Sequence, residues 1–404
     1  MVVVTVMGIG RVGLPLALFL SSKNFKVYGL DVDVAKVEQV KKGLMPFKEE
    51  EGEKFLNNAL QKGFVPTTDI SCIKESDVII LTLGTPVDEF LNPDYKQLHM
   101  ALDSMMPYLR ENQILILRST VSPKTTEYMK EQIESINGFT VGKNFFIAFC
   151  PERIAQGVAF KELEELPEIV GGIDKQSAEK AAEFFKIYKK EVLQTTSLNA
   201  ELLKLFTNMY RYINFAIANE FLVIAEHWGG NIHEIVKLAN KNYPRDGLKS
   251  PGFTAGPCLF KDGFFLTSGI PFPELITAAW SINEGMPAYL VNKVKNLTPI
   301  KGKKCLILGM SFKPNNDDQR ASLSHKLKKT LKKEMANVMI HDVHTHDAKF
   351  EDYLKESDIV FLATPHDEYK KEFEHYKSHM KEGSIMVDIW NTLNQQDSIF
   401  KINK

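Results

Sequence analysis

The sequence predicts an α/β protein in which two Rossmann-like parallel-sheet domains are joined by a central helical domain with one long helix. Three observations predict this fold. Short apolar segments alternate with helical segments at both ends of the chain, the two ends repeat one local sequence, and the middle holds a long helical stretch. Strands that alternate with helices are typical of parallel sheets built from βαβ units. We expect domains at 1–192, 193–296 and 297–404.

The composition is that of a soluble globular protein. The 404 residues provide for two or three domains, and 44% apolar with 25% charged residues excludes a largely disordered chain. Lys plus Arg (50) and Asp plus Glu (51) nearly balance, which argues against a general nucleic-acid binder. The chain has no apolar run of membrane-spanning length, and its first residues favour a strand, so we expect neither a membrane span nor a signal peptide. The four cysteines form no CxxC pair, so we expect no metal site, no disulfides and a cytoplasmic location.

Four apolar segments of the first domain are predicted strands that end in small or polar residues. They are 2–7, 26–30, 78–83 and 114–117. The predicted strands of the last domain follow the same order, at 305–308, 338–340, 359–362 and 384–387. The fragments KESDVIILTLGTP and KESDIVFLATP are nearly superimposable, which favours two related sheets. Chance similarity of two buried strands is the alternative.

The central stretch 199–228 contains neither Pro nor Gly. As a helix it would be roughly 45 Å long. Its apolar residues leave little of the circumference polar, so we expect it to pack against both end domains and against a second subunit. Gly229 and Gly230 end it. A second helix over about 271–295 leads to a linker at 297–303.

The glycines of GIGRVG indicate a dinucleotide site. Gly8, Gly10 and Gly13 follow a predicted strand and open a predicted helix, and Asp31 ends the next strand. This spacing provides a tight turn, close approach to a pyrophosphate and close helix–strand packing. Asp31 would bind ribose hydroxyls and repel a 2′-phosphate, which favours NAD over NADP. A helix N-cap is the alternative role of Asp31.

Three polar residues share one face of the predicted long helix. Lys204, Asn208 and Arg211 lie at positions i, i+4 and i+7. Because burying an unpaired lysine is costly, we expect an anionic or polar group opposite them. A solvated stripe is the alternative.

Cys258 lies in the Gly- and Pro-rich stretch 250–262, which we expect to be a loop. The neighbouring Lys261 and Asp262 could tune a thiol. An inert buried cysteine is the alternative.

The chain resembles the nucleotide-sugar 6-dehydrogenases of the UDP-glucose/GDP-mannose dehydrogenase family. The resemblance covers about residues 1–395. It rests on motifs in the family's order: GIGRVGLP (8–15), TP (85–86), STV (119–121), CPER (150–153), the helix at 200–220, PCLFKD (257–262) and LGMSFKPNNDDQRAS (308–322).

The resemblance implies oxidation of a UDP-sugar C6 alcohol to a carboxylate, with two NAD reduced per turnover. Cys258 would be the nucleophile that holds the sugar as a thiohemiacetal and then as a thioester. Lys204 and Asn208 would stabilise the oxyanion at C6. Glu152, Asp262 and Thr120 match positions tied to the water and the proton transfers. Their structural alternatives are a turn acid for the first two and a strand-end hydroxyl for Thr120.

The resemblance also implies two binding sets and a homodimer through the long helix. The residues expected at NAD are Gly8, Gly10, Arg11, Val12, Gly13, Asp31, Lys36, Thr85, Pro86 and Thr120. The residues expected at the UDP-sugar are Glu152, Arg153, Lys204, Asn208, Arg211, Arg245, Gly256, Lys313 and Arg320. An ion pair of Arg320 with Asp317 or Asp318 is the alternative role of that arginine.

The sequence departs from the family pattern at three positions. Ala255 and Pro257 precede the cysteine where the family is richer in glycine, and Leu323 stands where proline is usual. GFFL (263–266) and INEGMP (282–287) resemble the enzymes of N-acetylhexosamines. We therefore expect UDP-N-acetylmannosamine or UDP-N-acetylglucosamine as substrate. UDP-glucose is the alternative substrate. A two-electron hydroxyacid dehydrogenase and a non-catalytic nucleotide-sugar sensor are the alternative functions.

Overall fold

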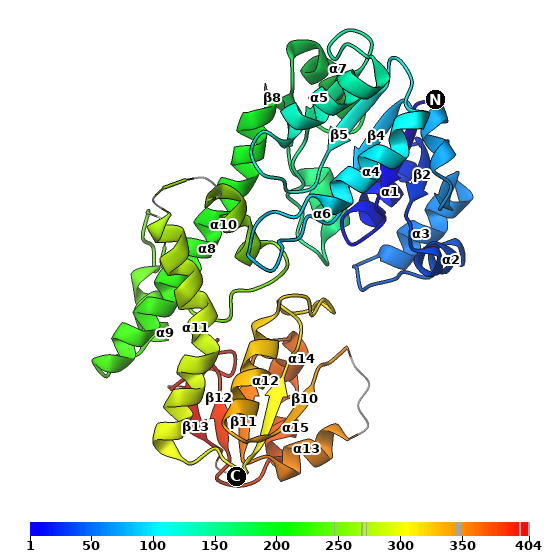
Figure 1. The fold of residues 1–404 in the computed structure, drawn as a ribbon. Coiled ribbons are helices and arrows are strands. Elements are labelled where there is room, and N and C mark those ends of the chain that lie inside the picture. The colour runs from blue at the N-terminus through cyan, green and yellow to red at the C-terminus, as the bar shows by residue number, and fades with distance from the viewer. Residues whose placement is uncertain (246, 268–269, 272, 345–348, 396, 403–404) are drawn as a thin grey trace. The chain divides into compact units, whose positions relative to one another are not determined.

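The structure is a computed structural model that describes residues 1–245, 247–267, 270–271, 273–344, 349–395 and 397–402. The chain forms two compact units. The first comprises Met1–Thr207 with Phe264–Ile270, and the second comprises Asn208–Gly263 with Pro271–Lys404. Each unit is built around one sheet with helices against it (Figure 1).

The sheet of the first unit has the strand order β3-β2-β1-β4-β5-β6-β7-β8 and is parallel except between β6 and β7. The strands are β1 (Val3–Met7), β2 (Lys26–Leu30), β3 (Phe64–Thr67), β4 (Val78–Leu81), β5 (Ile114–Leu117), β6 (Phe146–Phe149), β7 (Glu168–Gly172) and β8 (Val192–Thr196). The chain order reverses direction between β1 and β4, and ligands of such sheets bind at that switch point, beyond the carboxyl ends of the strands.

Helices cover both faces of this sheet. They are α1 (Gly13–Ser22), α2 (Val34–Lys41), α3 (Gly52–Gln61), α4 (Lys96–Met105), α5 (Thr125–Asn137), α6 (Ala159–Glu165) and α7 (Lys175–Lys186), with 3₁₀ turns at Ile70–Glu75 and Met106–Tyr108. Successive strand residues enter different cores: Val78 and Ile80 pack with α1, α3, α6 and α7, whereas Ile79 and Leu81 pack with α4 and α5. Burial on both faces explains why these strands read as unbroken apolar runs.

The middle of the chain is helical, as predicted. Its helices are α8 (Ser197–His227), α9 (Ile232–Ala239), α10 (Leu259–Thr267) and α11 (Glu274–Leu297). Beyond α8, Gly229 has a left-handed φ of +74° and the Gly230 amide donates to the Ala225 carbonyl (2.7 Å), so the glycine pair ends the helix as expected. The helix predicted over about 271–295 is α11; Phe272, within that prediction, lies outside the described residues.

Both ends of α8 are anchored in a core. Ala200 belongs to a core of the first unit, and Leu222 and Ala225 belong to a core of the second. The buried Glu201 carboxylate accepts hydrogen bonds from the amides of Lys124 (2.7 Å) and Thr126 (2.9 Å), which ties the amino-terminal part of α8 to the start of α5.

The second unit contains a sheet of order β10-β9-β11-β12-β13, parallel except for the last pair. Its elements are β9 (Lys304–Leu308), α12 (Leu323–Lys333), β10 (Asn337–His341), α13 (Phe350–Glu356), β11 (Ile359–Leu362), α14 (Asp367–Lys371), α15 (Phe373–His379), β12 (Ile385–Val387) and β13 (Ile399–Lys401). The order β10-β9-β11-β12 matches β2-β1-β4-β5 of the first sheet, so the predicted pair of related sheets is confirmed.

One local prediction was wrong. The stretch 250–262 is a loop only as far as Cys258, because α10 starts at Leu259.

None of the four cysteines, all of them described, forms a disulfide, and Cys258 alone among them is exposed. Among the described residues, no helix has both the length and the hydropathy that a membrane crossing requires.

Candidate active site

The glycine loop between β1 and α1 has a distinct steric reason for each glycine. Gly8 adopts a φ of +99°. A Cβ on Gly13 would lie 2.0 Å from the Gly8 carbonyl oxygen, so α1 packs against the loop only without a side chain there. A Cβ on Gly10 would meet nothing within 4 Å. The middle glycine therefore leaves its backbone open to a ligand at the amino end of α1, where the helix dipole favours a phosphate.

Asp31 follows β2 and faces this loop. Its Oδ2 accepts hydrogen bonds from the Ile9 amide (3.0 Å) and from Lys36 Nζ (2.8 Å), and its Oδ1 accepts one from the Asp33 amide (3.0 Å). Asp33, not Asp31, caps α2, so the alternative role of Asp31 as an N-cap is wrong. Lys36, expected at the cofactor, thus lies directly on the Asp31 carboxylate.

The segments after β4 and β5 are joined on the same edge of the sheet. Thr82 Oγ1 donates to the Gly8 carbonyl (2.7 Å), Thr85 Oγ1 donates to the Thr120 carbonyl (2.6 Å), and Ser119 Oγ donates to the Leu83 carbonyl (2.6 Å). Four of the residues expected at NAD, namely Gly8, Thr85, Pro86 and Thr120, therefore lie in connected turns.

The last two residues expected at NAD also lie in the glycine loop. The Arg11 guanidinium stacks over the Phe47 ring, 5.1 Å from its centroid, and Val12 occupies the N-cap position of α1. The open Gly10, the amino end of α1 and the Asp31 carboxylate form the donor and acceptor set that a dinucleotide needs, so the residues fit the cofactor.

The CPER segment follows β6 and ends in a buried ionic cluster. Arg118, at the end of β5, donates from Nε to Glu152 Oε2 (2.7 Å) and from Nη1 to Glu168 Oε1 (2.7 Å). The Glu152 Oε1 accepts from the amides of Arg153 (2.8 Å) and Ile154 (3.0 Å). The side chains of Arg118, Glu152 and Glu168 are less than a tenth exposed.

Arg118 and Glu152 hold each other in the ionised state. Burial by itself raises the pKa of Glu152, but the Arg118 guanidinium and the backbone amides outweigh it and keep that pKa below its usual value. Burial is not outweighed at Glu168, whose pKa is raised despite the same arginine. Burial opposes the charge of Arg118, yet its two carboxylate partners raise its pKa well above the usual value.

Lys204 on α8 meets this segment through the backbone. Its Nζ donates to the Glu152 carbonyl oxygen (2.6 Å). Arg153 turns away and donates from Nη2 to the Pro167 carbonyl. The prediction that a polar group lies opposite Lys204 is therefore confirmed, and the group is a carbonyl oxygen.

A second cluster of expected catalytic residues forms within the second unit. Asn208 Nδ2 donates to Asp262 Oδ2 (2.6 Å), and Lys261 Nζ lies 3.2 Å from Asp262 Oδ1. Asn208 and Asp262 are buried, so the alternative of a solvated stripe is wrong for Asn208. Arg211, the third member of the predicted face, is exposed.

Cys258 lies at the amino end of α10. The amides of Lys261 (3.2 Å) and Asp262 (3.1 Å) donate to its carbonyl oxygen. Because Cys258 is exposed, the alternative of an inert buried cysteine is wrong. An exposed thiol at the positive end of a helix dipole is suited to act as a thiolate nucleophile.

Two glycines and a buried amide fix the loop before Cys258. Gly252 packs on Trp390, and its amide and carbonyl are bound by the Asn219 side chain (2.9 and 3.1 Å). Asn219 Nδ2 also donates to Asn283 Oδ1 (2.8 Å). Gly256 has a φ of +110° and packs on the Phe312 ring. Ala255 and Pro257, which depart from the family pattern, are thus held in a defined path.

The basic residues expected at the nucleotide end are spread over several loops of the second unit. Arg245 is exposed and donates to the Tyr243 hydroxyl (2.9 Å). Arg320 binds Asp318 through Nε (2.9 Å) and Nη2 (2.7 Å), so the ion pair considered as its alternative role does form. Lys313 is half-buried, and its carbonyl accepts from Ser311 Oγ (2.9 Å).

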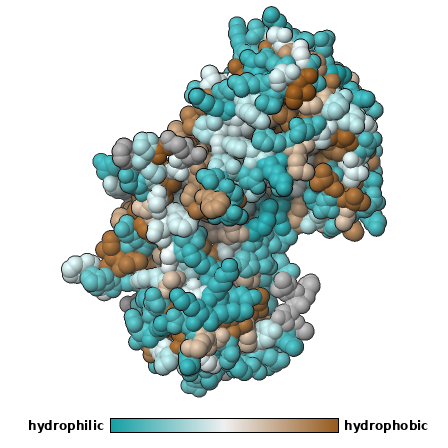
Figure 2. Space-filling model, viewed as in Figure 1, coloured by the Kyte–Doolittle hydropathy of each residue, from teal (hydrophilic) through white to brown (hydrophobic). Residues whose placement is uncertain are grey.

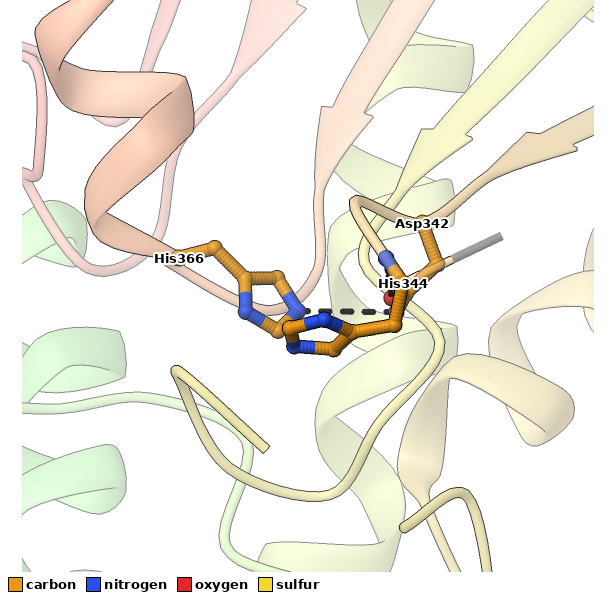
Figure 3. A group of neighbouring side chains, drawn as sticks. All are labelled: Asp342, His344 and His366. Atoms are coloured by element: carbon orange, nitrogen blue, oxygen red, sulfur yellow. Dashed lines mark hydrogen bonds and ion pairs between the residues drawn. The ribbon is translucent and has the colours of Figure 1, made fainter. Parts of the chain in front are cut away.

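Asp342 repeats in the second sheet the role of Asp31 in the first. It follows β10 and accepts from the amides of Met310 (2.7 Å) and His344 (3.0 Å). Figure 3 shows the His366 ring directed at its carboxylate, with Nε2 3.4 Å from Oδ2. Because the Asn315 amide donates to His366 Nδ1 (2.9 Å), the ring proton lies on Nε2, and these hydrogen bonds use the atoms that a metal ion would need.

Sequence reasoning missed several residues that shape these clusters. Arg118 and Glu168 were not singled out, although a charged residue directly after the apolar run 114–117 is a usable signal. Asn219 and Asn283 were not singled out as supports of the cysteine loop. Their partners lie 33 to 71 residues away in the chain, so no local spacing indicates them.

Comparison with known proteins agrees with the predicted family. The chain matches three domains of the UDP-glucose/GDP-mannose dehydrogenase family: the NAD binding domain over residues 2–190, the central domain over 198–284 and the UDP binding domain over 306–395. A UDP-N-acetyl-D-mannosamine dehydrogenase of Methanocaldococcus jannaschii is 31% identical and covers 97% of this chain and 93% of its own length.

Solved structures agree as well. A UDP-D-ManNAc dehydrogenase from Pyrococcus horikoshii has a TM-score of 0.90 at 30% identity and covers 96% of both chains. The UDP-N-acetyl-mannosamine dehydrogenase Cap5O from Staphylococcus aureus has a TM-score of 0.88 at 27% identity and covers 99% of this chain and 98% of its own. With its glycine loop and these full-length matches, the chain belongs to the UDP-glucose/GDP-mannose dehydrogenase family and binds NAD.

Proposed function

We propose that this protein is a UDP-N-acetyl-D-mannosamine 6-dehydrogenase, which oxidises the C6 hydroxyl of that sugar nucleotide to a carboxylate. The observation that carries the proposal is the full-length match to enzymes of that name, 31% identical over 97% of the chain. The exposed Cys258 thiol and the buried pair of Asn208 with Asp262 support it, because Cys258 precedes α10 and Asp262 lies in the first turn of that helix. Of the two N-acetylhexosamine substrates expected from sequence, the relatives favour the mannosamine.

The cofactor, when bound, accepts one hydride in each of two oxidations. The first converts the C6 alcohol to an aldehyde with loss of a hydride and a proton. The Cys258 sulfur then adds to C6, and the resulting thiohemiacetal loses a second hydride to become a thioester. Water cleaves the C–S bond, releasing the carboxylate and restoring the thiol. Overall, one sugar, one water and two NAD⁺ give one acid, two NADH and three protons.

Polar groups on α8 and α10 support these steps. We assign Lys204 and Asn208 to the oxyanion that develops at C6, because preorganised donors act most strongly on developing charge. Asp262, held by Asn208, is suited to take the proton of the attacking water, and Thr120 to bind that water. Glu152 and Arg153 lie on the segment that Lys204 contacts.

We place the UDP moiety against the basic residues of the second unit, Arg245, Lys313 and Arg320, together with Arg211 and Gly256. Arginine forks match phosphate oxygens, and Gly256 presents its backbone without a side chain. We place the enzyme in the cytoplasm, where its cysteines, which form no disulfide, would stay reduced.

We further propose a homodimer through α8. Tyr210, Ile217, Phe221, Ile224 and Trp228 are all exposed, and their spacing of seven, four, three and four residues places them on one helix face. Figure 2 shows hydrophobic surface gathered over α8 and α9, and Trp228 is 81% exposed. Such a contiguous apolar face is typical of a protein–protein interface.

Light scattering tests the dimer. Ile224→Glu places a charge in the centre of this face and is expected to give a monomer, whereas Leu275→Glu, at an exposed apolar residue of α11, is the matched control. A wild-type monomer, or an Ile224→Glu dimer as tight as wild type, would overturn the proposal.

A substrate panel tests the activity. NADH formation is measured with UDP-N-acetylmannosamine, UDP-N-acetylglucosamine, UDP-glucose and GDP-mannose. We expect the highest kcat/KM with the first and about two NADH per sugar consumed. A preference for UDP-glucose would overturn the substrate, and one NADH per sugar would overturn the four-electron reaction. Binding of NAD and sugar nucleotide without any turnover would favour the sensor.

A further inference from the structure

Arg118, Glu152, Glu168 and Lys189 form a buried ionic cluster in the first unit. Arg118 carries one charge between two carboxylates, and its side chain is only 3% exposed. Lys189 Nζ lies 4.0 Å from Glu168 Oε2, so two cations and two anions meet in a space almost closed to water. Buried pairs of this kind are weak evidence for stability, because apolar residues often replace them without loss. The contacts of Glu152 point to a second task for this cluster.

The side chain and the carbonyl oxygen of Glu152 bind different partners. Both carboxylate oxygens are occupied, Oε2 by Arg118 and Oε1 by the amides of Arg153 and Ile154. Its side chain thus points into the protein, toward the arginine. Its carbonyl oxygen instead accepts the hydrogen bond from Lys204 Nζ, at 2.6 Å.

The cluster and Lys204 therefore bind different parts of the same residue, Glu152: Arg118 binds its side chain and Lys204 binds its carbonyl oxygen. The side chain of Glu152 fixes the backbone of the segment, and that backbone fixes the ammonium. A planar fork that binds two carboxylates holds both in one geometry, which an ammonium cannot do, so arginine suits this position. Glu168, bound by Nη1 (2.7 Å) and Nη2 (3.3 Å), in turn fixes the plane of the guanidinium.

We propose that Arg118 and Glu168 are positioning residues for Lys204, which they align through the side chain and the carbonyl of Glu152. The proposal rests on the proposed function, in which Lys204 stabilises the oxyanion at C6. It also deepens that function, because it gives the Glu152 carboxylate an anchoring task in place of a proton transfer.

Two substitutions loosen the cluster without removing its bulk. Arg118→Lys keeps the charge but loses the fork, and Glu168→Gln keeps the shape but loses the charge. Arg110→Lys is the matched control, because Arg110 pairs with Asp77 at the surface of the same unit. We expect Arg118→Lys to lower kcat by about tenfold, because roughly one charge-assisted hydrogen bond is lost. The KM for NAD should stay within about twofold of the wild-type value. Glu168→Gln should show a smaller loss of the same kind.

A double-mutant cycle separates positioning from mere stability. If Arg118 acts through Lys204, Arg118→Lys has little further effect on single-turnover NADH formation in a Lys204→Ala enzyme. A structural role would instead lower the melting temperature and leave kcat of the folded enzyme unchanged in both backgrounds. Equal losses of kcat in the two backgrounds would overturn the proposal.

Hydrogen exchange supplies a readout that needs no turnover. The amides of Arg153 and Ile154 should exchange faster in Arg118→Lys and Glu168→Gln than in wild type, while Arg110→Lys leaves them unchanged. Unchanged exchange at these amides in both variants would overturn the proposal even where the enzyme is active. A chain that oxidises none of the sugars in the panel but shows faster exchange would overturn the proposed function alone.

Discussion

Two alanine substitutions in the glycine loop should have different effects: Gly13→Ala should lower the stability of the fold, and Gly10→Ala should lower the affinity for NAD. A Cβ on Gly13 would lie 2.0 Å from the Gly8 carbonyl oxygen and 2.4 Å from Thr82 Oγ1, whereas real Cβ atoms essentially never come within 3.0 Å of a neighbour. Gly13→Ala must therefore push α1 about 1 Å from the loop and break the hydrogen bond between Thr82 and Gly8. Overpacking costs about 1–3 kcal/mol and the hydrogen bond about 1 kcal/mol, so we expect a loss of about 2–4 kcal/mol in unfolding free energy.

Gly10→Ala is the informative counterpart. Its Cβ meets nothing within 4 Å and its φ is not positive, so the free energy of unfolding should not fall. The same methyl group would occupy the space left for the pyrophosphate, and we expect NAD affinity to drop by about tenfold or more, which is ~1.4 kcal/mol. Gly285→Ala, on the exposed side of α11, is the control and should stabilise the protein by up to about 1 kcal/mol without affecting NAD.

Urea unfolding and calorimetric titration with NAD measure the two effects on the same samples. The reasoning is refuted if Gly13→Ala is as stable as wild type. It is refuted equally if Gly10→Ala binds NAD as tightly as wild type, because the open space at Gly10 would then not face the cofactor.

Two further predictions concern the second unit. Gly252→Ala would place a Cβ 2.1 Å from the Trp390 ring, so we expect a loss of about 1–3 kcal/mol and a lower kcat; unchanged thermal unfolding would contradict the packing. Burial raises the pKa of Asp342, but hydrogen bonds from His366 and backbone amides outweigh it and hold that pKa below its usual 3.8. The carboxylate therefore stabilises the fold above about pH 4 and loses this effect as the pH falls through the lowered pKa. Asp342→Asn should cost about 2 kcal/mol at pH 7 and less at pH 3, as measured by urea unfolding; an equal cost at both pH values would contradict the ionised assignment.

The sequence predicted β1, β2, β4 and β5 of the first sheet and β9 to β12 of the second, and it missed β3, β6, β7, β8 and β13. Runs such as 114–117 lie in the middle of the sheet, and their apolar character is unambiguous. The missed β8 (Val192–Thr196) is an edge strand whose residues are exposed or half-buried. The missed β7 carries Gly171 and Gly172, which lower strand propensity but are required because a Cβ on either would lie 2.5 Å or less from a neighbouring atom. The domain boundaries 1–192, 193–296 and 297–404 stay a prediction.

The sequence likewise predicted some residues of the candidate site and missed others. Local spacing found the glycine loop with Asp31, and helical periodicity found Lys204 and Asn208. Arg118 was missed because its partners, Glu152 and Glu168, are 34 and 50 residues away in the chain. A charged residue directly after an apolar strand can also face solvent. Only packing in three dimensions shows that this arginine is buried.

The central claim is that the Cys258 sulfur bonds to the sugar carbon between two oxidations. Rapid-quench mass spectrometry of the intact enzyme with UDP-N-acetylmannosamine and NAD tests it directly. We predict a transient adduct of the sugar nucleotide on the Cys258 peptide, and a Cys258→Ser enzyme that lacks the adduct and does not reach the normal yield of two NADH per sugar. Full acid formation by Cys258→Ser at the wild-type rate, with no adduct on the wild-type enzyme, would contradict the account.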